Sequence, residues 1–519
     1  MATSVHTADA VIVGAGACGS LVAKVLAEQG WDVVVLEAGR RLNPATDLAN
    51  NEANGGKIMW TEPRVYADKH GVVPKTGVGV GGGTLVWLGV MPRFHPADFR
   101  TYSTESVGAD WPISYDELRP HYEQVEREFG VAGECGPYAP ESYRLPQPAH
   151  RMNWHAQLLA RGAAKLGATP FAPTVAVNSV PYDGRPACIY CGWCGSGCPT
   201  GAKATASQVY LSPAERAGAR VVSEAFVHRI TYDAKRGRAS GVEYVDAAGR
   251  EHAVNAKIVI IAAHAIETPR LLLLSANSTF PDGLANSSGK VGRALMSHPT
   301  WQVFGKFSSP VNAFKGMQMG HVMVQDFYKP DPRNDYARGY LLISYMMTPV
   351  TYANLNGGAY GLELKRFLYD YPYMAAWWAH AEGLPIETNA VTLDAEVKDS
   401  RGLPVARVTY EWGDNDIRLA GAARDKAAEM MAASGAERVQ IGLNYGAHAM
   451  GSCRMGDDPS TSVVNSYGQC HDVPNLFICD TSVFVTSAGV NPTLTAMALA
   501  QRSAEHLVAS VKRRELVGV

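Results

Sequence analysis

The sequence predicts an α/β fold organised around a dinucleotide-binding unit near the N-terminus. Three observations predict it. An apolar run at Ala10–Val13 ends at glycine, as a buried parallel strand does. Three glycines with G-x-G-x-x-G spacing follow, and a helical pattern then runs from about Ser20 to Gln29. A second apolar strand at Val33–Leu36 ends on the acidic residue Glu37, which completes the order of a Rossmann dinucleotide site.

Each residue of this motif has a physical role in the expected site. Gly14 permits the tight turn, Gly16 lets the backbone approach a pyrophosphate, and Gly19 lets the helix pack closely on the strand. Free N–H groups at the helix N-terminus would then bind the phosphates. Glu37 lies where a carboxylate can accept a hydrogen bond from a ribose hydroxyl, whereas an NADP site would prefer a basic residue there.

Size and composition narrow the class of protein further. A chain of 519 residues is too long for one ordinary core, so we expect at least two domains. A formal net charge of −2 argues against nucleic acid or an anionic membrane as the main partner. The sequence has no uninterrupted apolar run long enough to span a membrane and no basic region before its first strand. We therefore expect neither a membrane span nor a signal peptide.

Gly77–Phe94, with the sequence GVGVGGGTLVWLGVMPRF, is the second glycine-rich stretch. Gly81, Gly82 and Gly83 allow backbone conformations closed to other residues and a close approach to a flat ligand. The alternative is a glycine-rich surface loop. The bulky residues Leu85–Trp87, which follow directly, argue against a surface loop.

The remaining elements follow from periodicity. A helix is expected within Phe94–Gly130, a strand at Arg220–Ile230, a hairpin at Gly241–Ile261 ending in a buried apolar run, and a leucine-rich helix at His264–Ser275. Strands rich in Tyr, Phe and Met in Trp301–Gly442 indicate a sheet whose aromatic residues form a core or a sugar-stacking surface.

Four cysteines, Cys188, Cys191, Cys194 and Cys198, share the spacing C-x2-C-x2-C-x3-C-P. Bacterial ferredoxins use this run to ligate iron–sulfur clusters. The spacing therefore predicts a three-iron cluster on three of these thiolates, or a four-iron cluster on all four or with a distant thiol as its fourth ligand. Zinc is less favoured, because two cysteine pairs far apart would suit it better. Disulfides or buried thiols remain the structural alternative.

Two motifs near the C-terminus complete the pattern: NYGAHAMGSCRMG at Asn444–Gly456 and LFICDTSVFVTSAGVNPTLTAMALA at Leu476–Ala500. Together with the two glycine stretches and His264–Ser275, they resemble the glucose–methanol–choline (GMC) family of FAD oxidoreductases. The resemblance implies a Rossmann-like FAD-binding domain assembled from discontinuous segments, plus an α+β substrate domain with an antiparallel sheet. The implied segments are 1–100, 201–300 and 443–519 for the FAD-binding domain, 101–200 for a substrate and cysteine-cluster region, and 301–442 for the substrate domain.

The same resemblance assigns the site. His448 would be the base that faces flavin and alcohol, with Asn491 as its partner, whereas His264 and His298 would be structural. Val86 stands where some relatives attach the flavin to a histidine, so FAD would be held without a covalent bond. Besides Gly14, Gly16, Gly19 and Glu37, the implied cofactor-binding residues are Gly81, Gly82, Gly83, Thr84, Val227, Asp480, Pro492 and Thr493.

The implied reaction is oxidation of an alcohol of a sugar or polyol to a carbonyl. In the leading hypothesis a dehydrogenase passes electrons through the cysteine-bound cluster to an external acceptor. The alternative is an oxidase that acts on a long-chain or aromatic alcohol, uses oxygen and keeps the cysteines structural. Related sugar dehydrogenases work with a small subunit and a cytochrome. By its own sequence this chain would be cytoplasmic, and periplasmic only if exported with such a partner.

Overall fold

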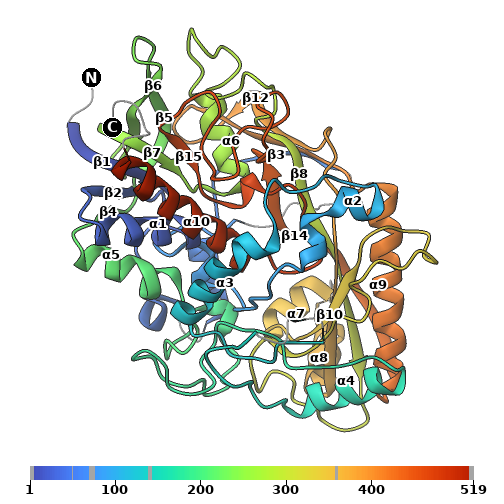
Figure 1. Ribbon diagram of the computed structural model, residues 1–519. Coiled ribbons are helices and arrows are strands. Elements are labelled where there is room, and N and C mark those ends of the chain that lie inside the picture. The colour runs from blue at the N-terminus through green and yellow to red at the C-terminus, as the bar shows by residue number, and fades with distance from the viewer. Residues whose placement is uncertain are drawn as a thin grey trace.

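The computed structural model describes residues 5–48, 51–68, 76–137, 139, 143–356 and 360–513. Two large sheets organise these residues, and Figure 1 shows them in different parts of the molecule. Helix α1 (Ala17–Glu28) packs on the first sheet, with α10 (Thr493–Lys512) packed against α1, and α9 (Asp414–Ala433) runs along the second sheet. This arrangement confirms the predicted α/β fold with a second, largely antiparallel sheet.

The first sheet has seven strands in the order β4-β2-β1-β7-β6-β5, with β15 beside the C-terminal part of β7. The first four strands are parallel, whereas β7, β6 and β5 are antiparallel neighbours. The strands are β1 (Val5–Val13), β2 (Val33–Leu36), β4 (Arg220–Val222), β5 (Phe226–Asp233), β6 (Arg238–Val245), β7 (Glu251–Ile261) and β15 (Leu476–Ile478).

Helix α1 (Ala17–Glu28) connects β1 to β2 and begins three residues before the predicted start. Gly16 is the N-cap residue, with extended backbone at φ −77° and ψ −163°. Gly19 therefore lies inside the first turn of the helix. The helix was predicted too late because glycine carries no apolar signal to mark the start of a periodic pattern.

The second sheet has the order β3-β13-β12-β8-β11-β10-β9, with β14 paired along β8. All of its pairs are antiparallel except β3 with β13. Its strands are β3 (Val65–Asp68), β8 (Arg293–Lys306), β9 (Met319–Val324), β10 (Tyr340–Tyr345), β11 (Met374–Ala381), β12 (Ala390–Lys398), β13 (Pro404–Tyr410) and β14 (Arg438–Ser452).

One face of the second sheet packs on helices and the other faces the interior. Trp377 and Val303 lie in an apolar cluster with Leu419 and Met430 of α9, and α4 adds Leu159. Because side chains alternate along a strand, the neighbours of Trp377 and Val303 point to the opposite face. The helices are α2 (Thr101–Glu105), α3 (Tyr115–Phe129), α4 (Trp154–Lys165), α5 (Ser212–Arg216), α6 (His264–Leu274), α7 (Pro349–Asn356), α8 (Leu362–Asp370), α9 (Asp414–Ala433) and α10 (Thr493–Lys512).

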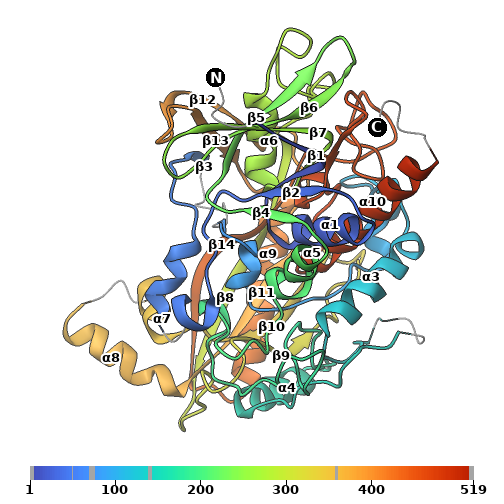
Figure 2. The ribbon, with the colours of Figure 1, turned by 90° about the vertical axis from the view of Figure 1, so that its left-hand side faces the viewer.

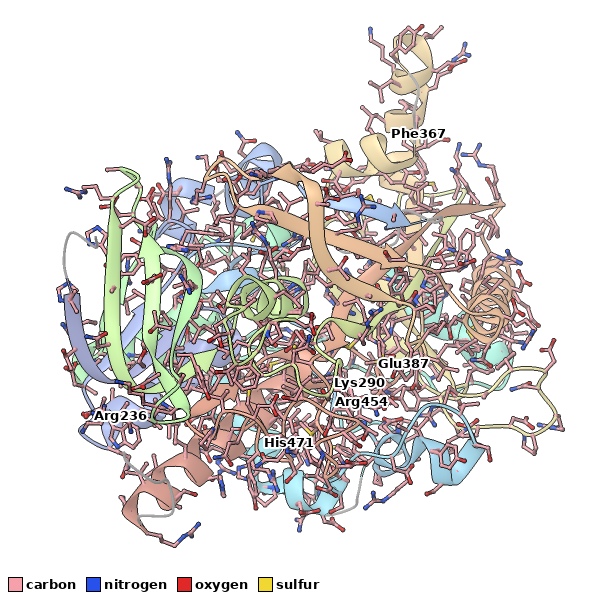
Figure 3. The ribbon with its side chains drawn as sticks, turned by 90° about the horizontal axis from the view of Figure 1, so that it is seen from above. Arg236, Lys290, Phe367, Glu387, Arg454 and His471 are labelled. Atoms are coloured by element: carbon pink, nitrogen blue, oxygen red, sulfur yellow. The ribbon has the colours of Figure 1, made fainter. Side chains whose placement is uncertain are left out.

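Helix α8 protrudes from the body of the molecule (Figure 2). Phe367 lies on this protrusion and stacks on Tyr352, with ring centroids 4.5 Å apart (Figure 3). Elsewhere in the same view, Lys290 and Glu387 form a surface ion pair of 3.1 Å. Within the described ranges, none of the helices is both long and apolar enough to cross a bilayer.

Candidate active site

A cavity of about 490 Å³ draws its lining residues from both sheets. Its walls include most of the residues predicted to bind a cofactor, although Gly19 and Gly81 are not among the lining residues. The predicted residues that line it are Gly14, Gly16, Glu37, Gly82, Gly83, Thr84, Val227, His448, Asp480, Asn491, Pro492 and Thr493.

The two glycine-rich stretches pack against each other at one wall. The Gly81 N–H donates to the Ala15 carbonyl over 2.9 Å. Gly82 has left-handed backbone at φ +56°, and a Cβ added there would lie 2.7 Å from Gly16 Cα. Glycine is therefore required at position 82 for the two backbones to approach. An added Cβ at Gly16 or Gly83, in contrast, would meet nothing within 4 Å.

Glu37 joins three loops at the same wall. Its buried carboxylate accepts hydrogen bonds from the N–H groups of Ala15 (2.8 Å), Gly39 (2.9 Å) and Gly79 (3.0 Å). Burial raises the pKa of this carboxyl, and the three hydrogen bonds oppose that rise. Glu37 therefore holds the glycine loop in shape, and it also lines the cavity.

The lining fits the FAD that the sequence resemblance implies. The N-terminus of α1 has no side-chain cap and no acidic residue in its first turn, so its N–H groups can donate to a pyrophosphate. Three buried ring nitrogens of cavity-lining residues have no hydrogen-bond partner among the described residues: Trp60 Nε1, His264 Nδ1 and Trp378 Nε1. An elongated polar ligand would satisfy such groups.

Asp480 holds another part of the wall. One of its carboxylate oxygens accepts from the His264 N–H (3.0 Å) and from the Thr268 hydroxyl (2.6 Å). The other oxygen accepts from the Ser482 N–H over 2.8 Å. Burial raises the pKa of Asp480 despite these bonds. Nearby in the chain, Pro492 caps helix α10 without a side-chain hydrogen bond, and this helix end also opens onto the cavity.

His448 and Asn491 meet at the cavity wall, with His448 Nε2 and Asn491 Nδ2 3.2 Å apart. His448 lies on β14, where the pairing with β8 shifts register between Ala447 and Met450. Its backbone is left-handed at φ +60°, which is uncommon for a residue with a side chain. Strained backbone of this kind is concentrated at functional sites.

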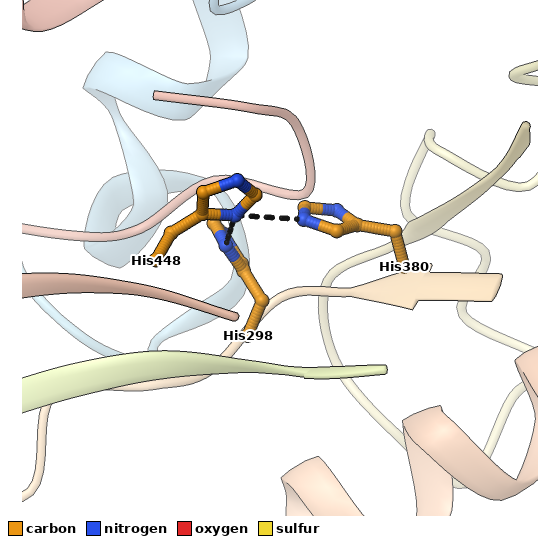
Figure 4. A group of neighbouring side chains, drawn as sticks. All are labelled: His298, His380 and His448. Carbon is orange, nitrogen blue, oxygen red and sulfur yellow. Dashed lines mark hydrogen bonds between the residues drawn. The ribbon is translucent and has the colours of Figure 1, made fainter. Parts of the chain in front are cut away.

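Two further histidines, which sequence reasoning did not place in the site, contact His448 (Figure 4). His298 Nδ1 lies 3.1 Å and His380 Nε2 3.3 Å from the same atom, His448 Nδ1. His298 was expected to be structural, and His380 lies within an apolar strand that reads as core. Burial lowers the pKa of all three rings, that of His380 to about 4.

Trp378 is a cavity-lining residue that the sequence did not identify. It lies two residues before His380 on β11, and so points to the same face of the sheet. Its indole nitrogen is one of the unpartnered groups in the cavity wall. The alternation of side chains along residues 376–381 puts Trp378 and His380 on one face of the strand. The sequence does not show which face of the strand points toward the cavity.

The four clustered cysteines lie outside the cavity lining, on a loop that contains a short 3-10 helix at Cys194–Ser196. All are free thiols. Burial raises the pKa of Cys188 to about 12, and nearby Cys191, Cys194 and Cys198 add to the rise. Burial also acts to raise the pKa of Cys198, but hydrogen bonds from Lys203 and Thr200 and the charge of Lys203 lower it overall. Cys188 therefore lies close enough to the other three sulfurs for their charges to affect its pKa.

Lys203 connects this loop to the cavity wall. Its fully buried ammonium donates to the carbonyl oxygens of Cys194 (2.8 Å), Trp87 (2.8 Å) and Leu85 (3.0 Å). Trp87 lines the cavity. Burial lowers the pKa of Lys203 to about 8, and the neighbouring cysteines oppose that fall.

Known proteins resemble this chain in sequence and in fold. Models of the GMC oxidoreductase family match residues 8–300 and 385–500. The 2-methyl-1,2-propanediol dehydrogenase of Mycolicibacterium austroafricanum is 33% identical, over 98% of this chain and 96% of that protein. The fructose dehydrogenase large subunit of Gluconobacter japonicus is 32% identical, over 99% of this chain and 100% of that protein.

Among solved structures, pyridoxine 4-oxidase from Mesorbium loti matches with a TM-score of 0.68 over 96% of this chain and 99% of that one. At 17% identity, this likeness supports the fold alone.

Proposed function

This chain belongs to the GMC oxidoreductase family of FAD-dependent alcohol and sugar oxidoreductases, and from that premise we propose that it is a sugar or polyol dehydrogenase with His448 as its base. One observation carries the proposal. The His448 ring and the Asn491 amide meet 3.2 Å apart in the wall of a glycine-lined cavity. An imidazole and an amide at this separation can both reach one hydroxyl group.

In the proposed reaction the substrate hydroxyl occupies the space beside His448 Nε2. Its O–H bond breaks, the proton forms a new N–H bond at Nε2, and the Asn491 amide donates to the alcohol oxygen. Bound FAD supplies the two-electron acceptor for the hydride that leaves the carbinol carbon. The low pKa of His448 keeps the ring neutral, which is the form that a base needs.

The protein holds the cofactor through backbone as much as through side chains. Gly14, Gly16 and the N-terminus of α1 would bind the pyrophosphate, and Glu37 is placed for a ribose hydroxyl. Val86, which lines the cavity, offers no atom for a covalent bond to flavin. We therefore propose non-covalent FAD.

The proposed substrate class rests on two lines of support. The two curated relatives are named for a diol and a sugar. In addition, the unpartnered indole N–H of Trp378 can donate to a second hydroxyl of a polyhydroxylated substrate. A simple long-chain alcohol would bring no acceptor for that donor and would forgo this hydrogen bond, worth about 0.5–1.5 kcal/mol.

We further propose that Cys188, Cys191, Cys194 and Cys198 would hold an iron–sulfur cluster, which would supply a one-electron acceptor for the reduced flavin. The support is the ferredoxin-like spacing, together with the contact that Lys203 makes between Cys194 and the Trp87 carbonyl at the cavity wall. The fructose dehydrogenase relative is named as a large subunit. By that likeness a small subunit and a cytochrome are the proposed partners, with export dependent on the small subunit.

Substitution of the base tests the reaction. His448→Ala should retain bound FAD but slow anaerobic reduction of the flavin by substrate at least about 100-fold, the usual contribution of a positioned base. The matched control is His155→Ala, another buried histidine that lies outside the cavity lining. Near wild-type reduction of His448→Ala in stopped flow would contradict the proposed role.

Iron analysis tests the electron path separately. Anaerobically purified protein should contain about three or four iron atoms per chain with sulfide, and should reduce dyes much faster than oxygen. Cys191→Ser and Cys194→Ser should remove the iron but spare flavin reduction. Iron-free protein that forms peroxide at full turnover would instead identify an oxidase.

A further inference from the structure

We propose that His298 and His380 are positioning residues that fix His448 in the tautomer whose Nε2 is unprotonated and can take the substrate proton. This inference rests on the proposed function, because it assigns the state of the base named there. It is carried by hydrogen-bond geometry at all three rings.

The tautomers of the two outer histidines follow from their backbone partners. His298 Nε2 lies 2.7 Å from the Ala488 carbonyl oxygen and 3.2 Å from that of Ser487. His380 Nδ1 lies 3.0 Å from the Gly489 carbonyl oxygen. A carbonyl oxygen can only accept, so the proton of each neutral ring must be on these nitrogens. The other nitrogens, His298 Nδ1 and His380 Nε2, are therefore acceptors.

Both acceptors face a single atom, His448 Nδ1, at 3.1 and 3.3 Å (Figure 4). Two acceptors require a donor between them, so the proton of neutral His448 lies on Nδ1. Its Nε2 is then an acceptor, and Asn491 must turn its amide N–H toward that atom at 3.2 Å. Each of these contacts therefore pairs a donor with an acceptor.

The surroundings keep the three rings neutral. His298 and His380 are almost completely buried, and the direct hydrogen-bond partners of the three rings are backbone carbonyls, the Asn491 amide and one another. Both outer rings already donate their own N–H to backbone carbonyls, and a second proton on either would place a charge on a ring buried among neutral groups. When Nε2 takes the substrate proton, the Nδ1–H therefore stays on His448. The two acceptor nitrogens, His298 Nδ1 and His380 Nε2, then stabilise the positive charge of the His448 ring.

Histidine labelled with nitrogen-15 allows a direct test by NMR, because protonated and unprotonated ring nitrogens have distinct shifts. We expect His448 of the oxidised holoenzyme to be protonated at Nδ1 only. Its signals are assigned by their loss in His448→Ala. A resting state with the proton on Nε2 would overturn the inference whatever the activity.

Variants separate positioning from simple packing. His298→Asn and His380→Gln place an amide acceptor near the lost ring nitrogen, at the δ and ε positions respectively, and should preserve the tautomer. The double variant His298→Leu/His380→Leu removes both acceptors. It should shift His448 away from the Nδ1–H form and slow flavin reduction at least about tenfold, with little change in KM. His155→Leu is the matched control for loss of a buried histidine.

The outcomes distinguish this inference from the proposed function. Full activity in His448→Ala would remove the base itself, and this inference with it. If His448→Ala is slow but the double leucine variant keeps both the tautomer and the rate, the inference alone fails. A stoichiometric metal ion that is lost in His298→Leu would also overturn it, because the metal would occupy the Nδ1 side. If the double variant does not fold, the single leucine variants and the two amide variants give the same comparison.

Discussion

Replacement of Gly16 by alanine should abolish cofactor binding without unfolding the protein. The backbone at Gly16 is ordinary for alanine, with φ −77°, and an added Cβ meets nothing within 4 Å. Alanine is a poorer N-cap than glycine by several tenths of a kcal/mol. It also reduces the entropy of the unfolded chain, worth about 0.4–1 kcal/mol in the opposite direction. The net change in the free energy of unfolding should be within about 1 kcal/mol.

The new methyl group would stand in the cavity, where the pyrophosphate must approach the N–H groups of α1. Loss of two hydrogen bonds to a charged group costs about 3–6 kcal/mol, equivalent to about a 10²- to 10⁴-fold rise in the dissociation constant for FAD. Gly82→Ala is the matched contrast. Its Cβ would lie 2.7 Å from Gly16 Cα on left-handed backbone, so it should cost about 2–5 kcal/mol of folding stability from strain and overpacking.

The assay measures flavin per chain after purification, FAD affinity by fluorescence titration, and stability by urea unfolding of the FAD-free protein. Gly16→Ala should lose FAD but unfold near the wild-type urea concentration, and Gly82→Ala should lose both. Native FAD affinity in Gly16→Ala would refute the assignment of this wall to the pyrophosphate.

Three further predictions concern the base, the substrate and the core. Burial, aided by His380, lowers the pKa of His448. The rate of flavin reduction should therefore stay constant as pH falls from 8 through 6.5 and decline only below pH 6.5. A rate already halved near pH 7 in stopped flow would contradict the lowered pKa. Trp378→Phe should raise the KM for a polyol more than it lowers kcat, whereas equal losses in a simple primary alcohol would argue against a hydrogen bond from the indole. Arg338→Met should lower the free energy of unfolding by about 3–5 kcal/mol, because it leaves two buried carboxylates, Asp98 and Glu382, and the partly buried Glu105 without their cation. The exposed Arg333→Met should leave the urea midpoint unchanged, and equal urea midpoints for the two variants would contradict this prediction.

Much of the fold could be predicted because its signals are local. A buried parallel strand, a glycine turn and an acidic residue at the end of the next strand each depend on neighbours in the sequence. The strand at Val33–Leu36 was therefore predicted with its observed bounds, and β7 ends at Ile261 as expected. Errors arose where glycine interrupts a pattern, as at the start of α1.

His448 and Asn491 could be named from motifs, but their surroundings could not. His298 lies 150 residues from His448, and only the register of β8 against β14 brings the two rings together. His380 joins them from β11, on the other side of β8. No local periodicity encodes that convergence, because each strand on its own is consistent with a buried core.

By itself, then, the sequence determined the dinucleotide motif and the order of the family's motifs, and it named His448 as the proposed base. The tertiary structure decided which nitrogen of His448 meets Asn491 and which meets His298 and His380. It also showed that Lys203 joins the cysteine loop to the cavity wall, a contact that spans 116 residues to Trp87. The physical reason is that residue types fix which hydrogen bonds are possible, whereas strand register and burial fix which partners are within reach.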